Sequence, residues 1–338
     1  FADTSLEDIF GPVGDPDALR IGRDFLAYRW DPNINSYQPV TSVVRGEAVW
    51  IVPTSDFGYR QLNGARLTND QDVGGLTTTL RPGWNMIGNP YSVPIPLSQI
   101  TAVFDGDPGQ ALTWSDLVTN GLVSSGLAYW ERNAEDPLSG FYRFTGGETD
   151  LIFPQVGYWV YVTTLQPIRL SWPPVFTPGL STLTRTAKQS TWKQTDKQWR
   201  VQLVARNESG VDAENYVGIT TSEQNANVLR RYEPPTSPNP TVELSVLGTV
   251  AGRETRLAQD LVAKSGKTTW KVQVRNHEAG EVTVNWPNVN TLPRNVRMTF
   301  VDPSTGTRRD MRYTSNYRFQ ASEPGTRSFN IEMEQGGT

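Results

Sequence analysis

Apolar and polar residues alternate along much of the chain with a period of two, which is typical of β-strands whose faces meet different surroundings. Bounded by Gly, Pro, Asn or Asp, the alternating segments are residues 48–53, 156–164, 198–206, 268–276, 281–286, 296–303 and 327–334. Helical patterns are short and few, at residues 5–10, 96–104 and 114–118,. The pattern therefore predicts an all-β chain with only short helical turns.

The pattern of the N-terminal half occurs twice. In the same order in both copies, the matched positions are Leu26-Ala27-Tyr28 with Leu127-Ala128-Tyr129, Tyr37 with Tyr142, and Trp50 with Trp159. An ordered series of matches is far less expected by chance than a single match. We therefore expect two tandem small β-modules, one over residues 1–76 and one over residues 77–175.

An opening strand precedes only the second copy, as GWNMIGNPYS at residues 83–92. Alternation places Trp84 and Ile87 on different faces of this strand, so we expect a bulge or burial of both faces. Gly88, Asn89 and Pro90 predict a sharp turn, because Gly can adopt positive φ and Pro interrupts the ladder. Without this strand, the first module has an open edge of unpaired backbone groups.

A Pro-rich stretch, SWPPVFTPG at residues 171–179, follows the two modules and predicts a semi-rigid spacer,. We expect a linker over residues 176–191 and a β-sandwich over residues 192–338. Within that region, the strand that begins at Trp199 resembles the strand that begins at Trp270. The two strands are expected to occupy the two sheets of the sandwich.

Two groups of motifs resemble parts of large secreted bacterial cell-surface proteins. The Gly-Trp-Asn-x-Ile-Gly-Asn-Pro opener and the later Gly-Tyr-Trp-Val strand are similar to β-modules of such proteins. The segments EPPTSPNPTVELSV, LAQDLV, VTVNW and MTFVDPSTGTRRDMRYTSNYRFQA resemble immunoglobulin-like segments near their ends. The resemblance covers most of the chain. It implies a location and an architecture, tandem modules followed by an immunoglobulin-like β-sandwich, and no particular chemistry.

Composition narrows the function classes. The 338 residues include 11 Trp, 12 Tyr and 12 Phe, which supply large buried areas although hydrophobic residues make up only 37%,. The net charge is −4 and both signs are interleaved, so no basic stripe indicates nucleic acid or a membrane surface as a partner,. No apolar run reaches the ~20 residues of a membrane span. The lack of Cys excludes thiolate metal sites and thiol catalysis,. The first residue is Phe, which favours a processed, secreted chain or an excised piece,.

Candidate catalytic groups are few, and no enzyme is expected. His277 is the only histidine, and its surroundings, VRNHEAGE, predict an exposed turn between two strands,. Paired acids lie in turn-forming sequences, at Asp15/Asp17, Asp70/Asp72, Asp105/Asp107 and Glu135/Asp136. Turn formation is the favoured interpretation of these acids. Calcium binding by Asp70, Asp72, Asp105 and Asp107 is the alternative, because their loops offer carboxylate oxygens.

The tryptophans allow two interpretations, because planar rings can either fill a core or stack on sugars. Trp50 and Trp159 occupy equivalent positions on apolar strands, which favours a core role. Trp30 and Trp130 lie beside polar residues, in RWDPN and YWERN, and are the better candidates for contact with a polysaccharide.

The incomplete first module favours a structural subunit of an extracellular or cell-surface assembly, such as a filament, sheath or surface layer. Subunits would join into a homopolymer by β-strand addition at the open edge, because a head-to-tail contact that does not close gives a polymer. The donor would be the C-terminal strand with Phe329, Ile331 and Met333, or an extended N-terminal segment. The alternative is a carbohydrate-binding or adhesive module of a larger secreted protein.

Overall fold

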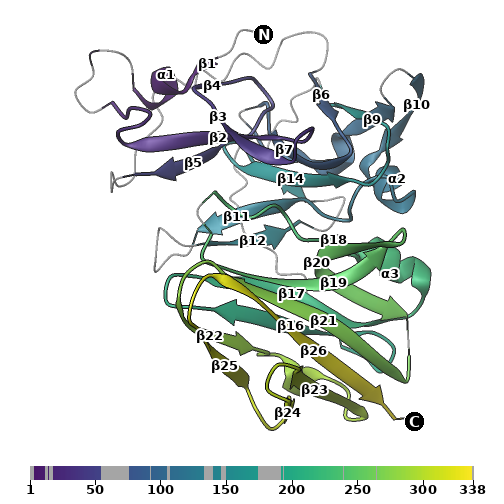
Figure 1. Ribbon diagram of the computed structural model, residues 1–338. Helices are drawn as coiled ribbons and strands as arrows, with labels where there is room; N and C mark the ends of the chain where they lie inside the picture. The colour runs from purple at the N-terminus through teal and green to yellow at the C-terminus, as the bar shows by residue number, and fades with distance from the viewer. Residues whose placement is uncertain are drawn as a thin grey trace. The chain divides into compact units, whose positions relative to one another are not determined.

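The computed structural model describes residues 4–11, 14, 18–54, 76–91, 93–104, 107–132, 140–145, 150–173, 192, 194–238, 240–263 and 265–336. It confirms a mostly β fold, in which each of the strands expected from alternation is present (Figure 1). The chain divides into two compact units: unit 1 comprises Phe1–Tyr129 and Phe144–Lys188, and unit 2 comprises Trp130–Arg143 and Gln189–Thr338. No helix in the described ranges is both long and apolar enough to cross a bilayer.

The second copy of the repeat contains two four-stranded antiparallel sheets, in the orders β10-β9-β15-β6 and β12-β11-β14-β7, and a short pair, β13-β8. Their strands are β6 (Thr77–Leu80), β7 (Gly83–Gly88), β8 (Ile95–Pro96), β9 (Thr101–Phe104), β10 (Asp107–Thr113), β11 (Ala128–Arg132), β12 (Gly140–Phe144), β13 (Leu151–Ile152), β14 (Gly157–Val162) and β15 (Ile168–Ser171). Both sheets contribute to one core, for example through Ile87, Val160 and Leu170. The second copy is therefore a small β-sandwich.

Two helical turns complete this sandwich where the sequence predicts them. A 3-10 turn, η1 (Leu97–Gln99), precedes β9, and the helix α2 (Trp114–Thr119) follows β10. Thr113 and Asp116 cap α2 reciprocally, each side chain bonding to the other residue's backbone N–H,. The cap explains why α2 begins at Trp114, whose side chain is buried in the core.

The first copy is smaller in the described residues. Its elements are β1 (Thr4–Ser5), α1 (Leu6–Phe10), β2 (Phe25–Asp31), β3 (Ser36–Pro39), β4 (Ser42–Val43) and β5 (Trp50–Pro53). The sheet β3-β2-β5 covers a core built on Leu6, Leu19, Phe25 and Ala27, and β1 pairs with β4. The Phe10 and Phe25 rings, 4.8 Å apart, bring α1 onto this core.

The two copies differ by one residue in the alignment of their Leu-Ala-Tyr segments. Ala27 pairs with Ile51 and faces the core of the first copy. Ala128 instead pairs with Trp159, on the face of β14 away from the second core. Because a one-residue slip exchanges the faces of a strand, the sequence match overlays residues that point in opposite directions. The tryptophans still correspond, since Trp50 pairs with Tyr28 on the same outer face.

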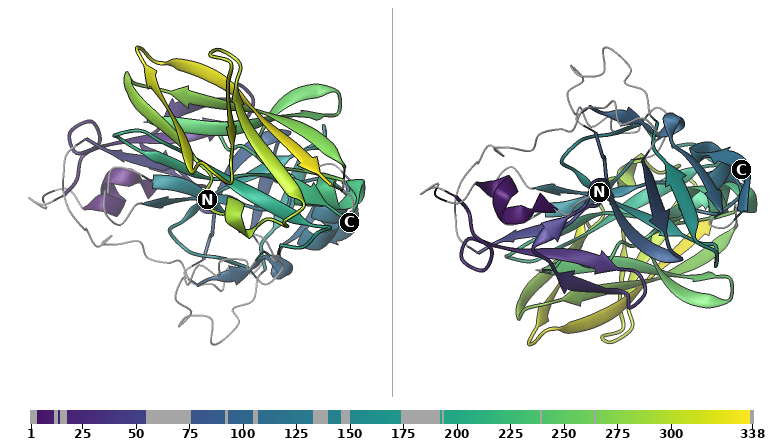
Figure 2. Two further views of the ribbon diagram at one scale, coloured as in Figure 1. Left: turned by 90° about the horizontal axis from the view of Figure 1, so that it is seen from below. Right: turned by 90° about the horizontal axis from the view of Figure 1, so that it is seen from above.

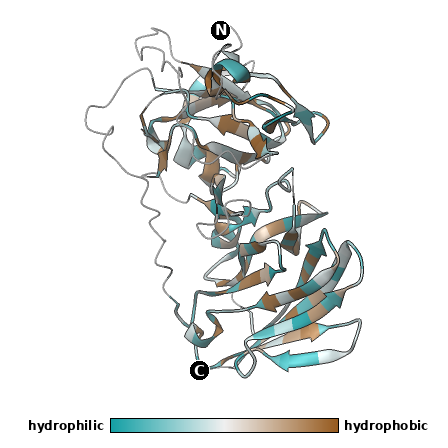
Figure 3. Cartoon of the chain, turned by 90° about the vertical axis from the view of Figure 1, so that its left-hand side faces the viewer, coloured by the Kyte–Doolittle hydropathy of each residue, from teal (hydrophilic) through white to brown (hydrophobic). Residues whose placement is uncertain are grey.

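Unit 2 contains one large mixed sheet in the order β24-β23-β26-β21-β19-β20-β17-β16-β22-β25, with β18 beside β20. Its elements are β16 (Trp199–Arg206), β17 (Val211–Thr220), α3 (Glu223–Leu229), β18 (Arg231–Tyr232), β19 (Val242–Val250), β20 (Arg253–Ala263), β21 (Lys267–Asn276), β22 (Gly280–Asn285), η3 (Val289–Thr291), β23 (Val296–Asp302), β24 (Thr307–Asp310), β25 (Asn316–Ala321) and β26 (Gly325–Gln335). All neighbours are antiparallel except β17 and β20. Apolar and polar residues alternate along many of these strands (Figure 3).

The large sheet curls into a half-barrel with a concave inner face (Figure 2). Strands from opposite ends of the order meet across the interior, where the Phe300 and Tyr317 rings are 4.9 Å apart. Trp199 and Trp270 meet edge to face at 6.4 Å, although three strands separate them in the sheet. The two related strands therefore face each other, as the sequence suggests, but they belong to one continuous sheet.

Candidate functional site

The opening strand of the second copy is β7, and both of its faces are covered by aromatic or apolar side chains. Ile87 is fully buried in the sandwich core. Trp84 lies on the other face, where its ring meets Trp159 at 6.1 Å and Tyr161 at 5.1 Å. The predicted opposite orientation of these two residues is thus explained by burial on both sides of the strand.

A turn ends β7 at Asn89, as predicted, but Gly88 does not have the positive φ that the sequence suggested. The Asn89 side-chain amide donates to the carbonyl oxygens of Val93 and Ile152, both at 2.8 Å. Its Oδ1 accepts the Tyr91 N–H at 2.8 Å, which closes the turn after Pro90. Asn89 therefore holds the chain against β13, the strand that contains Ile152.

Close backbone packing, and not positive φ, requires glycine at position 88. A Cβ atom there would lie 2.5 Å from the backbone oxygen of Glu47 in the first copy. The Gly88 N–H donates to the Gly46 carbonyl at 3.0 Å, and Ile87 forms an antiparallel bridge with Glu47. The Arg45 guanidinium adds a 2.8 Å bond to the Pro90 carbonyl. The opener is therefore docked onto the first copy along this short backbone segment.

Replacing Gly88 by Ala is expected to lower the free energy of unfolding of unit 1 by roughly 1–3 kcal/mol, because the Cβ meets backbone that cannot rotate away. Differential scanning calorimetry of the full chain measures the loss. Gly266→Ala is the matched control, since a Cβ at that glycine meets nothing within 4 Å. Equal losses in the two variants would contradict docking at Gly88.

A cluster of five aromatic residues joins the two copies within unit 1. We call it the aromatic cluster; its members are Trp30, Tyr37, Trp84, Trp159 and Tyr161. Trp30 approaches Trp159 at 5.3 Å and donates its indole N–H to the Trp84 carbonyl at 2.9 Å. Only 8% of Trp30 remains exposed. Its ring is therefore packed inside the protein. The polar residues beside it in the sequence had suggested a surface platform for a sugar, and that expectation is wrong.

The outer edge of β5 is where the first copy differs most from the second. In the second copy, β14 lies between β11 and the opener β7, whereas the corresponding order in the first copy is β3-β2-β5. Among the described residues, no strand pairs with β5 on the side that β7 would occupy. Ile51 packs on the core, while Val52 pairs with Leu26, which is 36% exposed. The edge predicted to be open is thus the edge without a paired strand in this part of the chain.

The C-terminal strand is not a free donor. Phe329, Ile331 and Met333 are almost completely buried on β26 in the core of unit 2. β26 pairs through residues 325–334 with β21 on one side and through residues 330–335 with β23 on the other. Donating it to another chain would break both ladders, so it does not fit the role that the sequence suggested for it.

The calcium prediction stays a prediction. Asp70, Asp72 and Asp105 lie outside the described residues, and of Asp107 only the backbone is described, at the start of β10. Among the side chains that are described, no three His, Asp or Glu residues are arranged to hold a metal ion.

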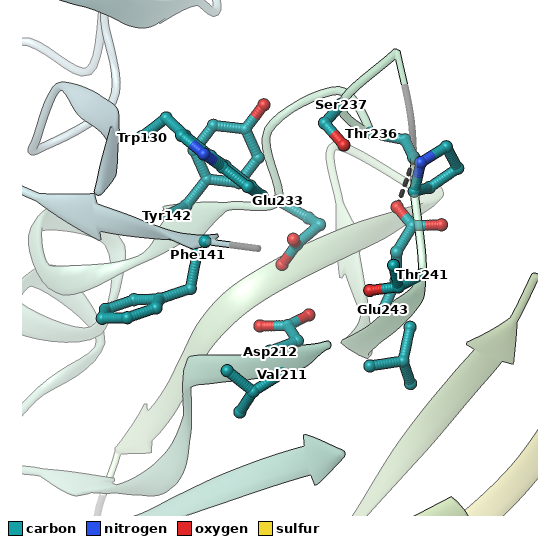
Figure 4. Close-up of a pocket in the computed structure, with 13 residues that line it drawn as sticks. Trp130, Phe141, Tyr142, Val211, Asp212, Glu233, Thr236, Ser237, Thr241 and Glu243 are labelled. Carbon is teal, nitrogen blue, oxygen red and sulfur yellow. Dashed lines mark hydrogen bonds between the residues drawn. The ribbon is translucent and has the colours of Figure 1, made fainter. Parts of the chain in front are cut away.

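A pocket of about 40 Å³ lies in unit 2 beside Trp130, the second sugar candidate (Figure 4). Trp130 is half-buried and meets the Tyr142 ring edge to face at 5.1 Å. Tyr142 donates its hydroxyl to the Pro235 carbonyl at 2.8 Å. No local pattern predicts this pocket, because the residues that line it come from segments far apart in the sequence: Trp130 and residues 140–142, residues 211–212, and residues 233, 236–237 and 240–243.

Three acids line the pocket and differ in protonation. Burial raises the pKa of Asp212 to about 7, although the Leu244 N–H and the Asn215 amide donate to its carboxyl. Burial, together with the charge of Asp212, raises the pKa of Glu233 well above its usual value. Burial also acts on Glu243, but Arg256, Thr236 and His277 outweigh it and lower its pKa.

His277 lies in a turn after β21, as predicted, but it is not exposed. Its Nε2 is 2.8 Å from Glu243 Oε2, and only 19% of its side chain is accessible. The single histidine is therefore paired with Glu243, an acid of β19.

Comparison of the chain with models of known protein families, with curated proteins and with solved structures finds no match.

Proposed function

We propose that the protein is a non-enzymatic structural subunit of an extracellular assembly, a filament, sheath or surface layer, whose copies join by β-strand addition at the incomplete first module. The supporting observation is the strand order β3-β2-β5, set beside β12-β11-β14-β7 in the second copy. β5 is an edge strand, whereas the corresponding strand of the second copy, β14, is paired on both sides. Such an edge is a natural acceptor for a strand of another chain.

The aromatic cluster favours this role because it holds β2, the strand that pairs with β5. Ring contacts of Trp30 and Tyr37 with Trp159 fix the sheet of the first copy against the second. The hydrogen bond from Trp30 to Trp84 and the bridge at Glu47 act in the same direction. A rigid edge loses little entropy when a strand docks, which strengthens the association.

The donor in this proposal is an extended segment of a neighbouring copy other than β26, which is already paired. The finer architecture, tandem copies of one ancestral module followed by an immunoglobulin-like region, is part of the same proposal. Unit 2 is like an immunoglobulin domain in that strands pack against each other across a shared core. It differs in that these strands belong to one continuous mixed sheet.

Sedimentation velocity over a range of concentrations tests assembly. The wild-type chain is expected to form growing oligomers, and electron microscopy should show polymers. Val52→Lys places a charge on the β5 edge and is expected to leave folded monomers. Leu165→Lys is the matched control, because Leu165 is 90% exposed in the bend between β14 and β15 and is not part of β5. A wild-type chain that stays a folded monomer at every concentration would refute the proposal, as would equal loss of assembly in the two variants.

The polysaccharide-binding alternative has less support. Of its two candidate residues, Trp30 is buried in the aromatic cluster, and Trp130 alone borders a pocket. That pocket is lined by three acids, whose chemistry favours a cation over a neutral sugar.

A further inference from the structure

The pocket beside Trp130 combines aromatic rings with carboxyl groups (Figure 4). The Trp130 indole lies over Gly140, where a Cβ would be 2.4 Å from the indole nitrogen, so glycine makes room for the ring. Arg143 bonds to Glu131 on β11 and, at 3.2 Å, to Glu214 on β17. These contacts, and the hydrogen bond from the Tyr142 hydroxyl to the Pro235 carbonyl, hold the rings of Trp130 and Tyr142 in place as the aromatic wall of the pocket.

One carboxyl oxygen in this pocket has no hydrogen-bond partner among the residues that the structure describes. Glu233 Oε2 is buried and bonds to none of them, unlike the oxygens of its two acidic neighbours. Asp212 accepts bonds from Leu244 and Asn215, and Glu243 from Thr236 and His277. Figure 4 shows the carboxyl groups of Glu233 and Asp212 pointing toward one another. When Glu233 is ionised, this oxygen is a buried acceptor without a donor among the described residues, and a ligand that donates hydrogen bonds would recover the free energy that this costs,.

The electrostatics of the pocket favour a cation. The charged groups that act on Glu233 are Asp212, Glu243 and Arg256, so acids outnumber bases around it. His277 contacts Glu243 and adds positive charge only when protonated. A positive group beside Glu233 would neutralise the acids and would also interact with the faces of aromatic rings.

Size and ligand geometry decide which cation fits. A volume of 40 Å³ holds roughly three water-sized groups, given about 10–15 Å³ for each,. This is too small to enclose a sugar ring but matches an ammonium group with its adjoining methylenes. The acids are not arranged as metal ligands within the described residues. Lysine carries a compact ammonium group with three hydrogen-bond donors at the end of a flexible stem, which suits a narrow acidic pocket.

We propose that this pocket binds the ammonium tip of a lysine side chain presented by another protein chain, with Glu233 as its principal acceptor and Trp130 and Tyr142 as its aromatic wall. The inference is independent of strand addition at β5, because it concerns unit 2 and is measured with a small ligand.

Nα-acetyl-lysine N-methylamide is the probe, titrated into the full chain while the Trp130 indole N–H is followed by NMR. Saturable binding is expected. The norleucine analogue, which lacks the amine, should not bind. Affinity should increase between about pH 6 and about pH 8, on either side of the Asp212 pKa of about 7, because Asp212 then ionises,.

Glu233→Gln is expected to weaken binding by about tenfold or more, because a charge-assisted hydrogen bond is lost. Glu323→Gln, at an exposed position, is the matched control and should bind as the wild type does. Asp212→Asn serves the same purpose if Glu233→Gln fails to fold. Binding that is unchanged in both pocket variants would overturn the proposal, as would no binding at about pH 8. Glucosamine binding in place of the lysine probe would also overturn it and would favour a sugar ligand.

Discussion

Replacing Asp302 by Ala is expected to lower the free energy of unfolding of unit 2 by about 3–5 kcal/mol, the usual cost of breaking a buried ion pair from one side. The Asp302 side chain is completely buried and accepts 2.6 Å bonds from the Tyr317 hydroxyl and the Arg327 guanidinium. Ser304 donates both its N–H, at 2.9 Å, and its hydroxyl, at 2.7 Å. Alanine would leave all these donors without their acceptor.

Urea denaturation followed by far-UV circular dichroism measures this loss. Glu281→Ala is the matched control, because Glu281 also pairs with an arginine of unit 2, Arg318, but both side chains are more than half exposed. An exposed pair contributes only about 0–1 kcal/mol, so the control should change stability little. Similar losses in the two variants would show that burial of Asp302 does not decide its contribution.

The same residue predicts a pH dependence. Burial acts to raise the pKa of Asp302, but the bonds from Tyr317, Ser304 and Arg327 outweigh it and lower the pKa to about 2. A lowered pKa means that the folded state prefers the ionised acid. The contribution is therefore complete above the unfolded pKa of about 3.9 and is lost as the pH falls toward about 2. On the order of 2 kcal/mol should disappear over this window, and Asp302→Asn should remove that dependence.

How much the sequence reveals depends on whether a strand has one buried face. The strand at residues 327–334 alternates clearly, so its position and its buried residues were predictable. β19 begins with Val242, Glu243, Leu244 and Ser245, all of them buried, because both faces of this stretch are covered. Alternation gives no signal for such a strand. The polar residues are buried because partners from distant segments bond to them, as His277 does to Glu243.

The candidate sites show the same limit. The opener, and a β5 edge with no paired strand among the described residues, were predictable because they depend on the order of segments along the chain. The burial of Trp30 was not predictable, because Trp84, which covers it, lies 54 residues away in the sequence. The polar neighbours Arg29 and Asp31 were misleading, since they point to the opposite face of the strand,. The acidic pocket is harder still, since Asp212, Glu233 and Glu243 have no local spacing in common.

Replacing Trp159 by Ala is expected to lower the free energy of unfolding of unit 1 by about 3–5 kcal/mol, because a large buried side chain leaves a cavity. Trp159 is only 2% exposed, and its ring contacts the rings of Trp30, Tyr37 and Trp84. Thermal unfolding measures the loss, with Leu165→Ala as the exposed control in unit 1, expected to stay within about 0.5 kcal/mol of the wild type.

A double-mutant cycle with Trp30→Ala separates a shared cluster from two independent modules. Trp30 belongs to the first copy and Trp159 to the second, and their rings are 5.3 Å apart. If the cluster joins the copies, the losses should be non-additive by about 0.5–3 kcal/mol, since either variant already removes the contact. Additive losses would mean that the copies are stabilised separately. The β5 edge would then have no rigid support from the second copy, and strand addition there would carry a larger entropy cost.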